Sequence, residues 1–73
     1  EWEDYTGAII WAQKLLAQDS CNEDAYRLLI ASHIGLGQHN RAAHWYGLCA
    51  RTLGTELGIQ PSTRTRALLE KIA

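Results

Sequence analysis

The stretch that decides the fold runs from residue 23 to residue 58 and reads EDAYRLLIASHIGLGQHNRAAHWYGLCARTLGTELG. On each side of Gly37, apolar and small residues recur at intervals of three and four, which places their side chains on one face of a helix. These residues are Ala25, Leu28, Leu29, Ser32 and Leu36 before the glycine, and Ala42, Tyr46, Cys49, Leu53 and Leu57 after it. Two amphipathic stripes joined by a short glycine turn predict two antiparallel helices.

The first of these two helices carries a second apolar face, formed by Tyr26, Ile30, His33 and Ile34. A helix that is apolar on two sides is expected to pack between two other helices. The pair is therefore predicted to belong to a larger helical array.

The whole chain, residues 1–73, is predicted to be one all-α domain with helices over residues 2–18, 21–36, 39–57 and 63–72. Ser20 and Glu23 have the spacing of a capping box, which predicts the start of the second helix. Gly58 and Pro61 end the third helix, and Ser62 is suited to cap the fourth. The core is predicted to contain Tyr5, Ala8, Ala12, Leu29, Ala42, Tyr46, Cys49 and Leu53.

Composition excludes several classes of protein. Seven basic residues against eight acidic ones give a net charge of −1, so direct contact with nucleic acid is not expected. No apolar run approaches the roughly 18 residues of a membrane-spanning helix. Two cysteines are too few for a disulfide framework and fit a cytoplasmic protein. Because the chain begins at Glu1 without a methionine, we expect a fragment of a longer protein.

An internal repeat is visible when the chain is shifted by 34 residues. The shift aligns Ala8 with Ala42 and Trp11 with Trp45, and it places Leu15 over Cys49. A period of 34 residues with paired helices resembles the tetratricopeptide repeat. This resemblance implies antiparallel helix pairs that form a fragment of a right-handed superhelix of about four helices.

The end of the chain indicates which family of tetratricopeptide-like proteins the sequence resembles. The stretch LGTELGIQPSTRTRALLEKI combines a long helix, an E-L-G-x-x-P-S turn and a short final helix. Together with the repeat it resembles the bacterial transcriptional activator domain, a tetratricopeptide-like module of bacterial transcription regulators. The resemblance implies a non-catalytic module that self-associates or contacts other protein, including the rest of the regulator.

Catalytic and metal-binding constellations are not recognisable. His33, His39 and His44 lack the i, i+4 spacing of a metal-binding helical pair. Cys49 occupies a small core position, and nothing in the sequence places a base beside either cysteine. We therefore predict no enzyme activity, no metal and no cofactor.

The partner-binding surface is predicted around Ile10, Trp11, Trp45 and Leu48. Each tryptophan flanks the core stripe of its helix, so it either packs on a neighbouring helix or forms a binding surface, where tryptophan is enriched. Helix 2–18 resembles the second helix of a repeat, so part of its apolar surface is expected to need another copy or a further segment. Arg27 is a possible contact in the groove.

Two alternative functions stay open at this point. The chain could be a general tetratricopeptide scaffold that binds a peptide or partner protein outside transcription. It could also be an accessory domain that touches DNA through Arg64, Arg66 and Lys71, in which case binding would depend steeply on salt.

Overall fold

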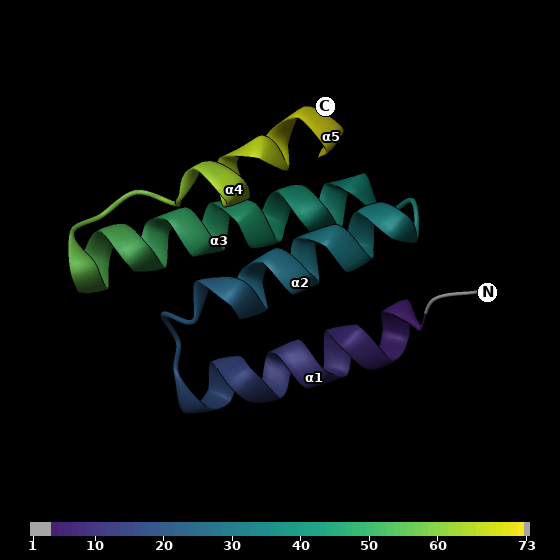
Figure 1. Cartoon of the computed structure of the whole chain (residues 1–73), viewed down its shortest axis with the longest axis horizontal. Coiled ribbons are helices and arrows are strands. Elements are labelled where there is room, and N and C mark those ends of the chain that lie inside the picture. The colour runs from purple at the N-terminus through teal and green to yellow at the C-terminus, as the bar shows by residue number, and fades with distance from the viewer. Residues whose placement is uncertain (1–3, 73) are drawn as a thin grey trace.

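The computed structural model describes residues 4–72 of the chain. Its elements are α1 (Tyr5–Gln18), α2 (Glu23–Gly35), α3 (His39–Leu57), α4 (Thr63–Ala67) and α5 (Leu69–Ile72). Figure 1 shows these helices side by side in chain order, α1 to α3 in alternating directions, with α1 at one edge and the α4–α5 segment at the other. The all-α, tetratricopeptide-like fold predicted from the sequence is confirmed.

Helix α2 is buried on two sides, as its two apolar faces predict. On one side, Ala25 and Leu29 form a buried cluster with Ala12 of α1. On the other, Tyr26 forms a second cluster with Cys49 and Leu53 of α3. Each of these six residues has at most 3% of its surface exposed, so α2 is the centre of the packed layer.

Most of the predicted core residues are buried. Ala12, Leu29, Ala42, Cys49 and Leu53 are fully enclosed. Tyr5, Ala8 and Tyr46 are only partly buried.

The start of α2 differs from the capping box predicted at Ser20 and Glu23. The helix begins two residues later than expected, because Asn22 is the N-cap and its Oδ1 accepts a hydrogen bond from the backbone N–H of Ala25 at 3.2 Å. The carbonyl of Ser20 instead accepts the Tyr26 hydroxyl at 2.9 Å, and Glu23 turns towards the C-terminal segment. Asparagine caps a helix as well as serine does, so the local sequence permits either residue as the N-cap.

Helix α3 has the predicted bounds. Gly58 ends it in the left-handed conformation, with φ 66° and ψ 29°, which glycine adopts without steric cost. The N–H groups of Gly58 and Ile59 donate to the carbonyls of Gly54 and Leu53. The first predicted helix, 2–18, begins later in the structure, because Asp4 is the N-cap of α1; positions 2 and 3 lie outside the described residues.

The stretch 63–72, predicted as one helix, is divided into α4 and α5 at Leu68. The N–H of Leu68 bonds to the carbonyl of Thr65, three residues back, at 3.1 Å. This tighter turn interrupts the regular four-residue pattern of hydrogen bonds although Leu68 keeps helical dihedral angles.

The packing of α3 predicts the effect of a larger side chain at Ala42, which is fully buried. Ala42→Leu should lower the free energy of unfolding by about 1–3 kcal/mol, because extra methyl groups overpack a filled core. Ala43→Leu is the matched control, since Ala43 is the exposed neighbour on the same helix. Urea unfolding of both variants checks this; an equal effect at the two positions would contradict the packing described.

Candidate functional site

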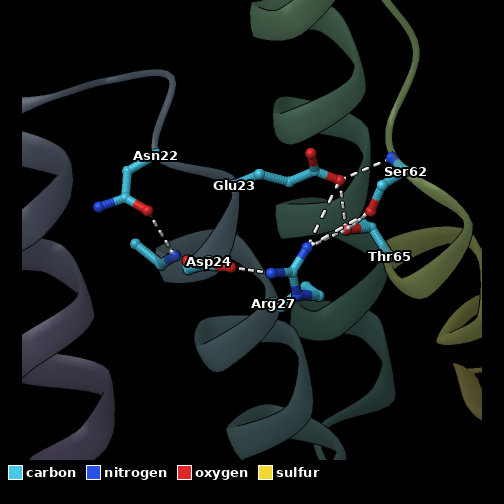
Figure 2. Close-up of polar contacts among 7 residues, drawn as sticks. Asn22, Glu23, Asp24, Arg27, Ser62 and Thr65 are labelled. Atoms are coloured by element: carbon cyan, nitrogen blue, oxygen red, sulfur yellow. Dashed lines mark hydrogen bonds and ion pairs between the residues drawn. The ribbon is translucent and has the colours of Figure 1, made fainter.

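A cluster of polar side chains joins the start of α2 to the start of α4 (Figure 2). This Glu23 cluster consists of Glu23, Asp24 and Arg27 of α2, and of Ser62 and Thr65 from the C-terminal segment. The Oε2 atom of Glu23 accepts a hydrogen bond from the backbone N–H of Ser62 at 2.6 Å and another from the Thr65 hydroxyl at 2.5 Å. Ser62 and Thr65 lie 39 and 42 positions after Glu23 in the sequence, and both donate to this one carboxylate oxygen.

Arg27 completes the cluster. Its Nη1 donates to the Thr65 hydroxyl at 3.2 Å and lies 3.7 Å from Oε2 of Glu23. Its Nη2 pairs with Asp24. The side chains of Arg27 and Glu23 are each 21% exposed. The predicted groove contact, Arg27, is therefore already engaged by partners within the chain.

The cluster follows from the way α4 begins. Ser62 is the N-cap, but its side chain makes no capping hydrogen bond, and the third helical residue is Thr65 rather than an acid. In a capping box the acid at that third position accepts the N–H of the N-cap residue. Here Glu23 of α2 accepts that N–H instead, so the start of α4 is capped by a different helix.

The environment of Glu23 favours its ionised form. Burial raises the pKa of the carboxyl, but the hydrogen bonds from Thr65 and Ser62 and the positive charge of Arg27 lower it by more, so the pKa lies below its ordinary value. A carboxylate stabilised in this way is a weak proton acceptor. Thr65 is fully buried, and its hydroxyl donates to that carboxylate. The cluster therefore positions helices.

Cys49, His33 and His39 also have defined surroundings within the chain. Burial, followed by the negative charge of Glu23, raises the pKa of the Cys49 thiol to about 11, so Cys49 is a neutral thiol at pH 7. His33 is buried and its Nδ1 lies 2.8 Å from Oε1 of Gln38, whereas Nδ1 of His39 lies 3.1 Å from the carbonyl oxygen of Ile72. Within residues 4–72, no group of His, Cys, Asp and Glu side chains could hold a metal ion.

Two of the predicted partner-binding residues lie open on the outer edge of the layer. Ile10 is 51% exposed and Trp11 is 58% exposed, both on α1. Lys14 follows them by about one helical turn and is the single charged residue among the 14 of α1. We call these three residues the α1 edge. An exposed tryptophan and isoleucine on a helix with one charge are unusual for a solvated face.

The other two predicted residues lie against the core. Trp45 is partly buried and packs against both buried clusters, with its ring centroid 6.5 Å from that of Tyr26. Leu48 is partly buried against the cluster of Tyr26, Cys49 and Leu53. The four predicted residues are thus divided between the open side of α1 and the interior of the layer.

The basic residues of the DNA-binding alternative, Arg64, Arg66 and Lys71, are exposed on α4 and α5. No helix in the described part of the chain combines the length and the apolar character needed to cross a membrane.

Sequence reasoning missed the contacts of Glu23 with Ser62 and Thr65. The capping-box spacing of Ser20 and Glu23 predicted that Glu23 would cap the start of α2. The signal that could have revealed the contact is the S-T-R-T sequence at residues 62–65, because a capping serine without an acid three residues later leaves its N–H in need of an acceptor.

Comparison with known families gives a match over the whole chain. The model of the family described as "Bacterial transcriptional activator domain" matches residues 1–73, which confirms the resemblance carried by the repeat and the E-L-G-x-x-P-S turn. No curated protein and no solved structure matches the chain.

The Glu23 cluster predicts that Glu23→Gln destabilises the fold. The amide replaces a charged acceptor of two hydrogen bonds, so the free energy of unfolding should fall by about 1–3 kcal/mol. Asp24→Asn is the matched control, because the Asp24 side chain is 82% exposed and its loss should cost no more than about 0.5 kcal/mol. Urea unfolding at pH 7 measures both; equal effects would contradict the role assigned to Glu23.

The lowered pKa of Glu23 predicts how this contribution depends on pH. The folded state binds fewer protons at this carboxyl than the unfolded state does, so stability rises with pH. The contribution is complete above the unfolded pKa of about 4.3 and is lost as pH falls through the lowered folded pKa. The difference in unfolding free energy between the wild-type chain and Glu23→Gln should therefore shrink in that acid range. A difference that stays constant there would show that the charge is not responsible.

Proposed function

Because the chain belongs to the bacterial transcriptional activator domain family, we propose that it is a non-catalytic protein–protein interaction module of a bacterial transcription regulator in the cytoplasm. In this proposal the α1 edge carries the contact, through Ile10 and Trp11. Trp45 and Leu48 support the surface from within the layer.

The observation that carries the proposal is the exposure of Ile10 and Trp11 beside a single charged residue. Tryptophan is enriched among the residues that dominate binding energy, and charged residues are depleted at the centres of protein interfaces. The α1 edge has both properties. The two free cysteines, Cys21 and Cys49, are in keeping with a reducing compartment.

The Glu23 cluster supports an interaction role over a catalytic one. Glu23 and Arg27 form hydrogen bonds with residues at the start of α4, and the Cys49 thiol is buried. These three side chains are thus engaged in holding the fold together. The α1 edge, in contrast, is apolar and exposed.

The proposal predicts that the chain associates in a concentration-dependent manner, and that Trp11→Ala weakens this association roughly tenfold, as loss of a central interface tryptophan does. Sedimentation equilibrium over a concentration series measures the effect. Leu57→Ala is the matched control, because Leu57 is 56% exposed, nearly as much as Trp11, and lies at the end of α3.

A dimer that persists unchanged in Trp11→Ala would contradict the assignment of the contact to the α1 edge. A monomer at every concentration would exclude self-association. The α1 edge would then be proposed to bind a different polypeptide.

A further inference from the structure

We propose that residues 61–72, which we call the latch segment, open as one unit while α1, α2 and α3 stay folded, and that the Glu23 carboxylate holds this segment closed. The inference goes beyond the proposed function, because the latch segment contains α4 and α5 and lies at the edge of the layer opposite α1 (Figure 1). It is carried by the way in which the segment is attached to α2 and α3.

Side chains of α2 and α3 hold the latch segment near both of its ends. Near its start, Oε2 of Glu23 accepts the backbone N–H of Ser62 at 2.6 Å and the Thr65 hydroxyl at 2.5 Å (Figure 2). At its end, Nδ1 of His39 lies 3.1 Å from the carbonyl oxygen of Ile72. These contacts break when the segment moves away from α2 and α3.

The backbone hydrogen bonds of the latch segment are local. The N–H of Arg66 donates to the carbonyl of Ser62 at 2.9 Å, and the N–H of Leu68 donates to the carbonyl of Thr65 at 3.1 Å. Helices as short as α4 and α5 are not stable in isolation. A detached latch segment therefore loses these bonds, and its amide hydrogens then exchange with solvent.

Apolar burial holds the latch segment less firmly than it holds the other helices together. Pro61 is buried, but Leu68 and Ile72 are half-buried and Leu69 is 43% exposed. In α2, by contrast, Leu29 is fully enclosed. Because the free energy of burial grows with the apolar area removed from water, detaching the segment costs less than unfolding the whole chain.

The connection between α3 and the latch segment can serve as a hinge. Gly58, with φ 66°, ends α3, and the N–H of Ile59 donates to the carbonyl of Leu53. These contacts belong to the end of α3 and do not involve the latch segment. Gln60, which follows them, is exposed and lies outside any helix, so a change in its dihedral angles moves the segment and leaves α3 intact.

Opening changes the chemistry that this part of the surface presents. In the closed state the side chains of Glu23 and Arg27 are each 21% exposed, and both form hydrogen bonds with the fully buried Thr65. In the open state the carboxylate and the guanidinium group lose these partners and face solvent. A molecule that binds either group only in this state shifts the equilibrium towards it.

Hydrogen exchange of the full chain, followed by NMR with magnetisation transfer from water for the fast amides, tests the inference. We expect the amides of Arg66 and Leu68 to share one opening equilibrium constant, roughly tenfold or more above that of the Leu29 amide in α2. Urea well below the unfolding midpoint should accelerate exchange at Leu29 and leave Arg66 and Leu68 nearly unchanged, because opening the segment exposes little surface.

Glu23→Gln tests what holds the latch segment closed. The variant should raise the opening of the Arg66 and Leu68 amides roughly tenfold, because the charged acceptor of two hydrogen bonds is lost. Asp24→Asn is the matched control, since the Asp24 side chain is 82% exposed, and it should leave the same two amides unchanged.

Ala12→Gly separates opening of the segment from unfolding of the whole chain. Ala12 is fully buried on α1, and glycine destabilises a helix relative to alanine. Exchange of the Leu29 amide should therefore be accelerated roughly fivefold. The Arg66 and Leu68 amides should exchange as in the wild-type chain.

Three results would overturn the inference. Equal acceleration of the Arg66, Leu68 and Leu29 amides by Ala12→Gly would show that the segment unfolds only together with the whole chain. Exchange at Arg66 and Leu68 that does not respond to Glu23→Gln would show that this carboxylate does not hold the segment closed. Unequal opening equilibria at Arg66 and Leu68 would show fraying in place of the opening of one unit.

Discussion

The structure depends on the burial of α2 between α1 and α3. Ala25 and Leu29 pack against α1, and Tyr26 packs against α3. Helix α2 therefore contributes to both buried clusters. Small side chains, Ala12 and Cys49 among them, occupy fully buried positions in the two clusters. A core of this size supplies only ~3–5 kcal/mol, which makes every further tie between elements significant.

The C-terminal segment is attached in a different way. Within α4 and α5, Thr65 is the fully buried residue, Leu69 remains 43% exposed and Ile72 is half-buried, so no large apolar side chain of these two helices is fully enclosed. The Glu23 cluster and the contact of His39 with the Ile72 carbonyl attach the segment by hydrogen bonds, beside the buried Pro61. Hydrogen bonds demand specific geometry, and a buried hydroxyl left without a partner is costly. Polar contacts therefore define the register in which α4 docks.

Most of the fold could be predicted because its signals are local. Periodicity identified the helices, the glycine at position 58 ended α3 at the expected residue, and the 34-residue shift equals the distance between the starts of α1 and α3. What could not be predicted depends on contacts distant in sequence. The sequence pattern pairs Glu23 with the nearby Ser20. In the structure Glu23 contacts Ser62, which lies 39 residues away in the sequence. A local rule cannot decide between them, because the choice depends on where α4 docks.

The candidate site illustrates the same limit. The sequence places Trp11 and Trp45 at equivalent positions, and the helical wheel allows both to be either core or surface. The structure separates them: Trp45 packs against both clusters, and Trp11 lies open at the edge. The side chain and the helix position are the same in both cases, so the difference lies in whether a neighbouring helix covers them. In a repeat architecture an apolar residue therefore becomes a candidate for binding where no described helix covers it, and the equivalent residue one period later packs against the core.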